Sequence, residues 1–315
     1  MNPTSLPPDE DLTEARKPAS LLIAQFFLFP LIIIGICIGI FLFFGYLTYE
    51  QRSLTQYLDD VRAGSGNQRW QAAFELSNQV KSNPERARTP DFIERLMTVY
   101  KNSPDEDMVV RGYLALILGE LKERSATPLL IEGLAREEKL KSADWSSRTW
   151  FFLRPSLDKI ANDLVQSQIS TLFALASIGD NAAVPAVLEQ VNSKDPDVRN
   201  IAVYASGVLG DQRAVEVLRP RVNDAKQDVS INAALALAQL GNGEGADLLM
   251  MLLDHSYVDG LPDFTSEQKA ELMANAIRAL TKLKHEPAVE KIRELSRTDP
   301  VPAVRIAALE AVKKF

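Results

Sequence analysis

The pattern of apolar and polar positions divides the chain into two parts. Residues 21–47 carry no charged side chain, and Gln25 is the one strongly polar residue among them. From about residue 66 onward, apolar residues instead recur every three or four positions, as they do on one face of a helix. The pattern therefore predicts one long apolar helix, followed by a series of shorter amphipathic helices.

The apolar run is long enough to cross a membrane as a helix. A bilayer core is about 30 Å thick, so about 20 apolar residues are sufficient. A cleavable signal peptide has a shorter apolar region and a small-residue cleavage site, and residues 43–49 lack such a site. We therefore predict a polar acidic tail at 1–18, a single transmembrane helix in contact with lipid at 19–49, and a juxtamembrane linker at 50–65.

Two features of this segment bear on orientation and association. Arg16 and Lys17 directly precede it, and basic residues favour the inner side. This favours an N-terminus inside and a translocated C-terminal part, with a bacterial inner membrane as the expected location. Gly35 and Gly39 form a pattern of small residues that lets two membrane helices approach closely. It predicts a possible homodimer through this helix, with chance occurrence of glycine as the alternative.

A unit of 31 residues repeats in the second part of the chain. Residues 197–202, DVRNIA, lead to LGD at 209–211 and then to AVEVL at 214–218. Residues 228–249 follow the same order 31 positions later, and residues 178–188 contain its second half 31 positions earlier. Each unit predicts two helices joined by a turn, with glycine where the first helix ends. One such hairpin cannot bury its own apolar face, so neighbouring units must stack.

This unit resembles the short HEAT repeat found in phycobilisome-lyase-type proteins. The resemblance rests on DPDVR at 195–199, followed by Ala202 and the LGD turn. Weaker copies extend it over residues 66–315, as six or seven units. It implies an all-α fold, with a right-handed α-solenoid of HEAT-like helical hairpins. HEAT arrays serve as scaffolds in many unrelated systems, so the resemblance implies a protein partner without identifying it.

Two departures from the period predict insertions, at residues 136–161 and 254–265. Insertions in repeat proteins often lie on the binding face. The first contains large aromatic side chains of the kind that dominate interface energies. The alternative is an extra packed hairpin whose aromatic residues fill its own core. The partner-binding candidates in this insertion are Trp145, Trp150, Phe151 and Phe152.

Two further columns of candidates follow the turns of the repeat. They lie on the second helix of each unit, which we expect to line the concave surface. An acidic column beside basic and methionine positions could form a polar binding groove; a solvated face without a ligand is the alternative. The members of the two columns are Glu216, Arg219, Asp247, Met250, Glu290 and Arg293.

Composition argues against an enzyme. The single cysteine, Cys37, excludes a cysteine-ligated metal site. Deoxyhypusine hydroxylase, a HEAT-repeat enzyme, binds iron through several His-Glu pairs, whereas this sequence has one, at His285 and Glu286. Neither histidine lies in a motif for nucleophilic catalysis. We therefore predict no catalytic residue, no metal and no cofactor.

Charge argues against nucleic acid as a partner. Residues 51–315 contain 33 basic and 37 acidic side chains, a net charge of -4, which is the wrong sign for a nucleic-acid-binding face. The sequence thus predicts a membrane-anchored HEAT-repeat scaffold that binds protein partners, as an assembly or accessory subunit of a membrane complex. The alternative is a bilin-lyase-like or other enzymatic HEAT-repeat protein.

Overall fold

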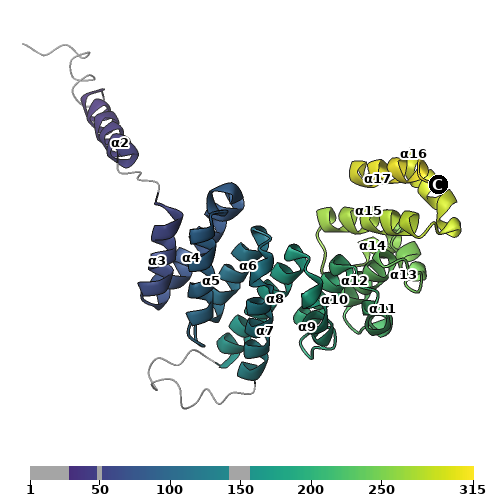
Figure 1. Cartoon of the computed structure of the whole chain (residues 1–315). Coiled ribbons are helices and arrows are strands. Elements are labelled where there is room, and N and C mark those ends of the chain that lie inside the picture. The colour runs from purple at the N-terminus through teal and green to yellow at the C-terminus, as the bar shows by residue number, and fades with distance from the viewer. Residues whose placement is uncertain (1–27, 48–51, 142–156) are drawn as a thin grey trace, which may run out of the picture. The chain divides into compact units, whose positions relative to one another are not determined.

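The computed structural model describes residues 28–47, 52–141 and 157–315, and every regular element in these ranges is a helix (Figure 1). The chain divides into two units, Met1–Arg52 and Ser53–Phe315. They are described separately below.

The first unit contains α2, which covers Phe29–Leu47. Its described side chains are exposed and almost all are apolar; Leu31 and Phe41, for example, are 68% and 78% exposed. Pro30 is tolerated at the start of α2 because the first residues of a helix need no backbone N–H donor. With 19 residues, α2 is about 28 Å long.

The predicted membrane span is corrected by this unit. Among the residues that the structure describes, no helix combines the length and the apolarity needed to cross a membrane. The predicted single-pass localisation is therefore wrong, and a transmembrane helix at 19–49 with lipid contact has no support. Residues 19–27 and 48–49 of the predicted span lie outside the described residues.

The small residues of α2 have no packing partner within the described chain. A Cβ atom built on Gly35 or Gly39 would find no atom within 4 Å. Both glycines are exposed on α2, and the predicted homodimer through this helix stays without support.

The second unit begins with a helix that the sequence analysis did not predict. Residues 54–63, inside the predicted linker at 50–65, form α3 (Leu54–Ala63). Ser53 and Gln56 form a capping box at its start, which satisfies backbone donors that a helix leaves free. Leu54, Leu58 and Val61 are buried at helical spacing, so α3 packs on the neighbouring hairpin instead of linking two parts.

The rest of this unit consists of helical hairpins whose first helices stack in one row and whose second helices form another (Figure 1). The first row comprises α4 (Gly66–Ser82), α6 (Met108–Glu120), α8 (Leu157–Ile178), α10 (Pro196–Leu209), α12 (Gln227–Gln239), α15 (Ser266–Lys282) and α17 (Pro302–Val312). The second row comprises α5 (Pro90–Asn102), α7 (Thr127–Lys141), α9 (Val184–Gln190), α11 (Ala214–Leu218), α13 (Ala246–Met251) and α16 (Val289–Thr298). Short 3-10 helices accompany the second row at Pro84–Ala87, Arg124–Ala126, Asn181–Ala183, Arg219–Asn223 and Glu286–Ala288.

Both predicted insertions change the helices around them. Part of the first, at 136–161, lengthens its neighbours: α7 continues to Lys141, and α8 has 22 residues where α10 has 14. The second, at 254–265, forms the additional short helix α14 (His255–Asp259) and a loop between α13 and α15.

Three hydrophobic clusters of described residues form the core, and the two larger ones meet at α12; the small one consists of Met108, Leu140, Ile160 and Leu164. Of the two larger clusters, one extends from Leu54 to Leu240 and the other from Ile231 to Ala311, so α12 contributes side chains to both. α10 lies very close to α12, because a Cβ on Gly207 would stand only 2.8 Å from the Cβ of Ala236. α15 packs against α12 less closely than α10 does. The stack is therefore tight before α12 and looser after it.

The turns between paired helices confirm the predicted repeat register. Positions 122, 179, 210, 241 and 284 all have positive φ angles, which complete left-handed turns at the ends of first-row helices. Glycine occupies three of them. Lys122 and Lys284 occupy the other two, with φ of 53° and 50°. A side chain with a Cβ is disfavoured there by about 1–2 kcal/mol.

We expect Lys284→Gly to stabilise the protein. Removing the Cβ relieves the strained conformation, and the extra backbone entropy of glycine offsets part of the gain, which leaves about 0.5–1 kcal/mol. Thermal denaturation followed by circular dichroism should show a melting temperature about 2 °C higher. Gly241→Lys is the matched control and should lower the melting temperature. A lower melting temperature for Lys284→Gly would contradict this explanation of the turn.

Candidate functional site

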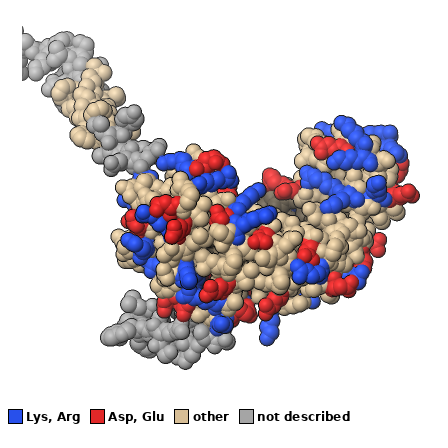
Figure 2. Space-filling model, viewed as in Figure 1, with Lys and Arg blue, Asp and Glu red and all other residues tan. Residues whose placement is uncertain are grey.

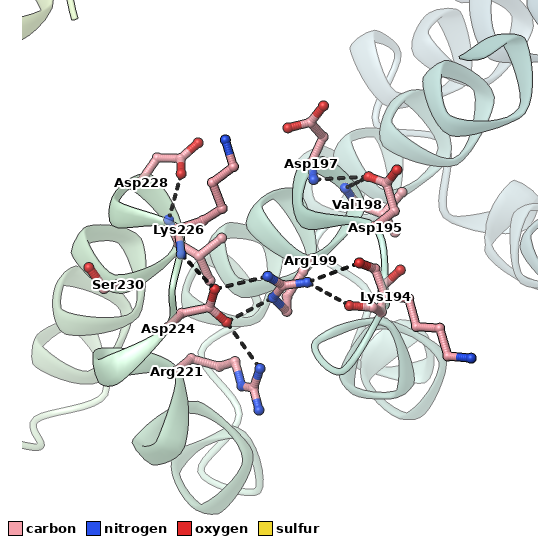
Figure 3. A network of polar contacts seen from close by, with 12 residues as sticks. Lys194, Asp195, Asp197, Val198, Arg199, Arg221, Asp224, Lys226, Asp228 and Ser230 are labelled. Carbon is pink, nitrogen blue, oxygen red and sulfur yellow. Dashed lines mark hydrogen bonds and ion pairs between the residues drawn. The ribbon is translucent and has the colours of Figure 1, made fainter. Parts of the chain in front are cut away.

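A buried ion pair joins consecutive repeats at the start of α10 and α12 (Figure 3). Arg199 donates from Nε and Nη2 to the two carboxylate oxygens of Asp224, at 2.8 and 2.9 Å, and from Nη1 to the carbonyl of Ser193 at 2.7 Å. Asp224 also accepts from Arg221 and from the backbone N–H of Lys226. These hydrogen bonds, that from Arg199 above all, lower the pKa of Asp224 to about 2. The network fixes where α12 begins relative to α10.

The arginine of the DVR motif has the same role in two other repeats. Arg111 and Arg305 each donate from Nη1 to a carbonyl a few residues earlier, Pro104 O and Asp299 O, both at 2.6 Å. This arginine, part of the motif by which the repeat is recognised, therefore anchors the loop before α6, α10 and α17.

Arg111 also belongs to a polar cluster in the interior, between α6, α7 and α8. Its side chain is 1% exposed and that of Glu137 is fully buried, with 3.9 Å between Arg111 Nε and Glu137 Oε1. Ser167 donates a hydrogen bond to the same Glu137 oxygen. Burial raises the pKa of Glu137 to about 7, although the Ser167 hydrogen bond and the charge of Arg111 act in the opposite direction. Because this cluster is enclosed by helices, we assign it a structural role.

The accessible candidate site is a groove on the first row, between α12 and α15, with α10 along one side. It consists of two adjoining cavities of 370 and 290 Å³ that share Asn232. We call it the α12–α15 groove and define it by residues from both cavities: Tyr204, Val208, Asp228, Asn232, Leu235, Gln239, Asp263, Phe264, Arg278 and Lys282. It opens where the stack is looser and where the second insertion supplies Phe264.

An aromatic and aliphatic column leads along the first row into this groove. Phe173, Tyr204 and Leu235 occupy the same position in successive repeats, 31 residues apart. The rings of Phe173 and Tyr204 are stacked, with centroids 6.4 Å apart and 7° between their planes. They are 43% and 41% exposed, and Val208 beside Tyr204 is 44% exposed. Exposed apolar side chains are ordinary when isolated, but these lie together on α8 and α10, and the partly buried Leu235 continues the column on α12.

The two ends of the groove carry opposite charges. Asp228 and Asp263 line the end where α12 begins, and Arg278 and Lys282 line the end where α15 finishes. Figure 2 shows basic side chains over the C-terminal helices and a largely uncharged surface over the central helices. Side-chain amides connect the repeats in between, since Asn232 donates to Asn200 Oδ1 at 2.8 Å.

The predicted polar columns lie elsewhere. Glu216, Asp247, Met250, Glu290 and Arg293 are on the second-row helices α11, α13 and α16, and Arg219 is in the 3-10 helix after α11. Side chains of the two columns form ion pairs with each other: Arg219 pairs with Glu216 at 2.7 Å, and Arg293 pairs with Glu290. None of them lines the α12–α15 groove. That the second helices line a binding surface stays a prediction, and α16 in this row has a pocket of its own, lined by Glu290, Lys291, Glu294, Arg297 and Thr298.

The other predicted candidates have different outcomes. Trp145, Trp150, Phe151 and Phe152 lie outside the described residues, so they stay a prediction.

In the second insertion, Asp254 caps α14 by accepting from the backbone N–H of Ser256 at 3.0 Å. His255 Nε2 lies 2.9 Å from Asp299 Oδ2. No three His, Cys, Asp or Glu side chains are grouped to hold a metal ion in the part of the chain that the structure describes.

The predicted columns do not include the groove residues, because they were drawn from the second helix of each unit. A signal was present: Phe173, Tyr204 and Leu235 recur with the 31-residue period on the first helix, beside small residues that must be buried. Which side of that helix faces solvent depends on how closely the hairpins stack, which the period alone does not determine.

Comparison with known proteins identifies the repeats. The family model for HEAT repeats matches residues 155–238 and 191–261. These residues are therefore HEAT repeats, as predicted, and the all-helical stack fits an α-solenoid. No curated protein matches the chain.

Solved structures support the same fold. The complex of CpcE and CpcF of phycocyanin lyase from Nostoc sp. PCC7120 aligns with a TM-score of 0.53 and 17% identity, covering 84% of this chain and 88% of that chain. An engineered protein aligns with a TM-score of 0.40 at 15% identity, covering 84% and 96%. Human deoxyhypusine hydroxylase in complex with glycerol aligns with a TM-score of 0.34 at 14% identity, covering 83% and 95%. The first of these similarities supports the fold alone.

Proposed function

We propose that the Ser53–Phe315 unit is a scaffold that binds a partner protein through its first row of helices. The observation that carries this proposal is the exposed, stacked pair of Phe173 and Tyr204, which leads with the partly buried Leu235 into the α12–α15 groove. Aromatic side chains are enriched at the centres of protein interfaces, where their burial supplies much of the binding energy. The HEAT repeats are consistent with such a scaffold.

The partner proposal also takes support from the phycocyanin lyase structure, which is a complex of two proteins, CpcE and CpcF. An assembly or accessory role beside a second protein is the form of scaffold that we propose here. The insertion residues Trp145, Trp150, Phe151 and Phe152 and the second-row polar columns are proposed as additional contacts. Exposed pairs such as Arg219 with Glu216 contribute little to stability, so they are available to a partner.

A bilin-lyase-like activity is the alternative, and the fold similarity to phycocyanin lyase is the observation in its favour. Visible absorbance separates the two functions. A chain that retains a bilin through purification, or transfers one to an acceptor protein, would replace the scaffold proposal by the enzymatic one.

The scaffold proposal is tested by affinity capture with the full chain and a Phe173→Ala/Tyr204→Ala variant. Truncating two central aromatic contacts should weaken partner capture about 10-fold or more. The melting temperature should change little, because both side chains are partly exposed. Met251→Ala on α13, also an exposed apolar side chain, is the matched control and should capture normally. Equal capture by the wild type and the double variant would refute binding through the first row.

A further inference from the structure

We infer that the α12–α15 groove selects a partner segment with opposite charges at its two ends: an acidic end against Arg278 and Lys282, and a basic end against Asp228 and Asp263. An apolar middle would contact Tyr204 and Leu235. This inference deepens the proposed function and rests on it, because it specifies the chemistry of the segment that the scaffold binds.

The length of the groove fits a short segment of a partner. Along α12, Asp228 and Gln239 are 11 residues apart, or about 16 Å. Along α15, Gln268 and Lys282 are 14 residues apart, or about 21 Å. A segment of about four helical turns, or about six extended residues, covers this distance. The two charged ends therefore lie far enough apart to contact different ends of one segment.

The four charged side chains are available for a partner. Asp228, Asp263, Arg278 and Lys282 form no ion pair within the described residues. Their hydrogen bonds are to uncharged groups: Lys282 donates to the carbonyl of Gln239 at 2.7 Å, and Arg278 to the side-chain amide oxygen of Asn275. Asp228 accepts from Asn200 at 3.4 Å and from the backbone N–H of Val229 at 3.1 Å. The second-row charges Glu216 and Glu290 are instead paired on their own surface.

Helix stabilisation explains only half of this charge pattern. Asp228 lies in the first turn of α12 and Lys282 in the last turn of α15, where each complements the helix dipole. Asp263 belongs to no helix, and Arg278 lies a full turn before the end of α15. The dipole therefore accounts for one charge at each end of the groove, and the second charge at each end points to a ligand.

The polarity also gives the groove a direction. A segment entering the opposite way would place like charges together at both ends, which disfavours that orientation. An apolar anchor supplies affinity while the end charges select orientation, so binding should weaken as salt rises.

The test begins with a random library of 14-residue displayed peptides, selected on the full chain. Enriched peptides should carry Lys or Arg at one end, apolar residues in the middle, and Asp or Glu at the other end. Fluorescence anisotropy then measures the best peptide against Arg278→Glu/Lys282→Glu, which should weaken binding about 10-fold or more. A peptide whose acidic end is changed to lysine should restore binding to this variant while binding the wild type poorly.

Two exposed charges at equivalent helix positions provide matched controls. Arg297→Glu changes the last turn of α16, and Asp158→Lys changes the first turn of α8, both outside the groove. Each should leave peptide affinity within about twofold of wild type.

Three outcomes overturn the inference: selection yields no peptide, the enriched peptides lack charge polarity, or the charge-swapped peptide fails to restore binding. The proposed function fails separately. If Phe173→Ala/Tyr204→Ala loses partner capture but Arg278→Glu/Lys282→Glu does not, first-row binding stands and the charge-selective groove is refuted. If neither variant affects capture, both are refuted.

Discussion

Replacing Arg111 by alanine should lower the free energy of unfolding by about 4 kcal/mol, since removal of one partner of a buried pair leaves the other without its charge partner. The guanidinium is 1% exposed, lies 3.9 Å from Glu137 and anchors the carbonyl of Pro104. The variant loses these interactions and leaves a cavity in the interior. Urea denaturation of the full chain, followed by circular dichroism, measures the change.

Two further variants separate the charge effect from the packing effect. Arg111→Met/Glu137→Leu removes both charges while keeping most of the volume, so it should recover most of the lost stability. Arg95→Ala breaks an exposed pair with Asp91 and should cost less than about 1 kcal/mol. A loss below about 1 kcal/mol for Arg111→Ala itself would show that the buried cluster does not stabilise the fold.

The second large effect is expected for Asp224→Ala, at about 3 kcal/mol of lost stability. Asp224 is 4% exposed and accepts from two arginines and a backbone N–H, so its removal leaves Arg199 without a carboxylate partner inside the stack. Chemical denaturation at pH 7 measures this loss. Glu216→Ala, which removes an exposed partner of Arg219, should change stability by less than about 1 kcal/mol.

The Asp224 prediction also has a definite pH dependence. The folded pKa of about 2 lies below the ordinary value of 3.8, so this carboxylate contributes its full stabilisation above about pH 4. That contribution decreases as the pH falls through the folded pKa. The stability difference between wild type and Asp224→Ala should therefore shrink between pH 5 and pH 2. A constant difference over this range would mean that the carboxylate charge is not what stabilises the wild type.

The repeat could be predicted from the sequence because its signals are local. A glycine such as Gly210 is required where a helix ends with positive φ, and the 31-residue spacing placed Lys122 and Lys284 at the same turn. The helix α3 was missed because it is a single amphipathic helix without a repeat partner in the sequence.

The groove could not be predicted because it depends on spacing between helices. Gly207 and Ala236 predict close packing of α10 and α12. No pair of residues in the sequence indicates that α15 packs less closely against α12. The side chains of Arg278 and Lys282 fit the ordinary solvated face of a helix. A role in binding is indicated only by the structure, which places Asp228 and Asp263 at the opposite end of the same groove.

The position of α12 between the two larger core clusters has a consequence for how the array unfolds. In a repeat protein each unit is stabilised by its nearest neighbours, so cooperativity is limited by the weakest junction. We therefore expect the array to open first at the looser α12–α15 junction, with α15 to α17 as the block that detaches. A segment lying in the groove would contact this block and the rest of the array at once. Its binding energy would therefore couple them, and slower amide hydrogen exchange in the C-terminal block would report the occupancy of the groove.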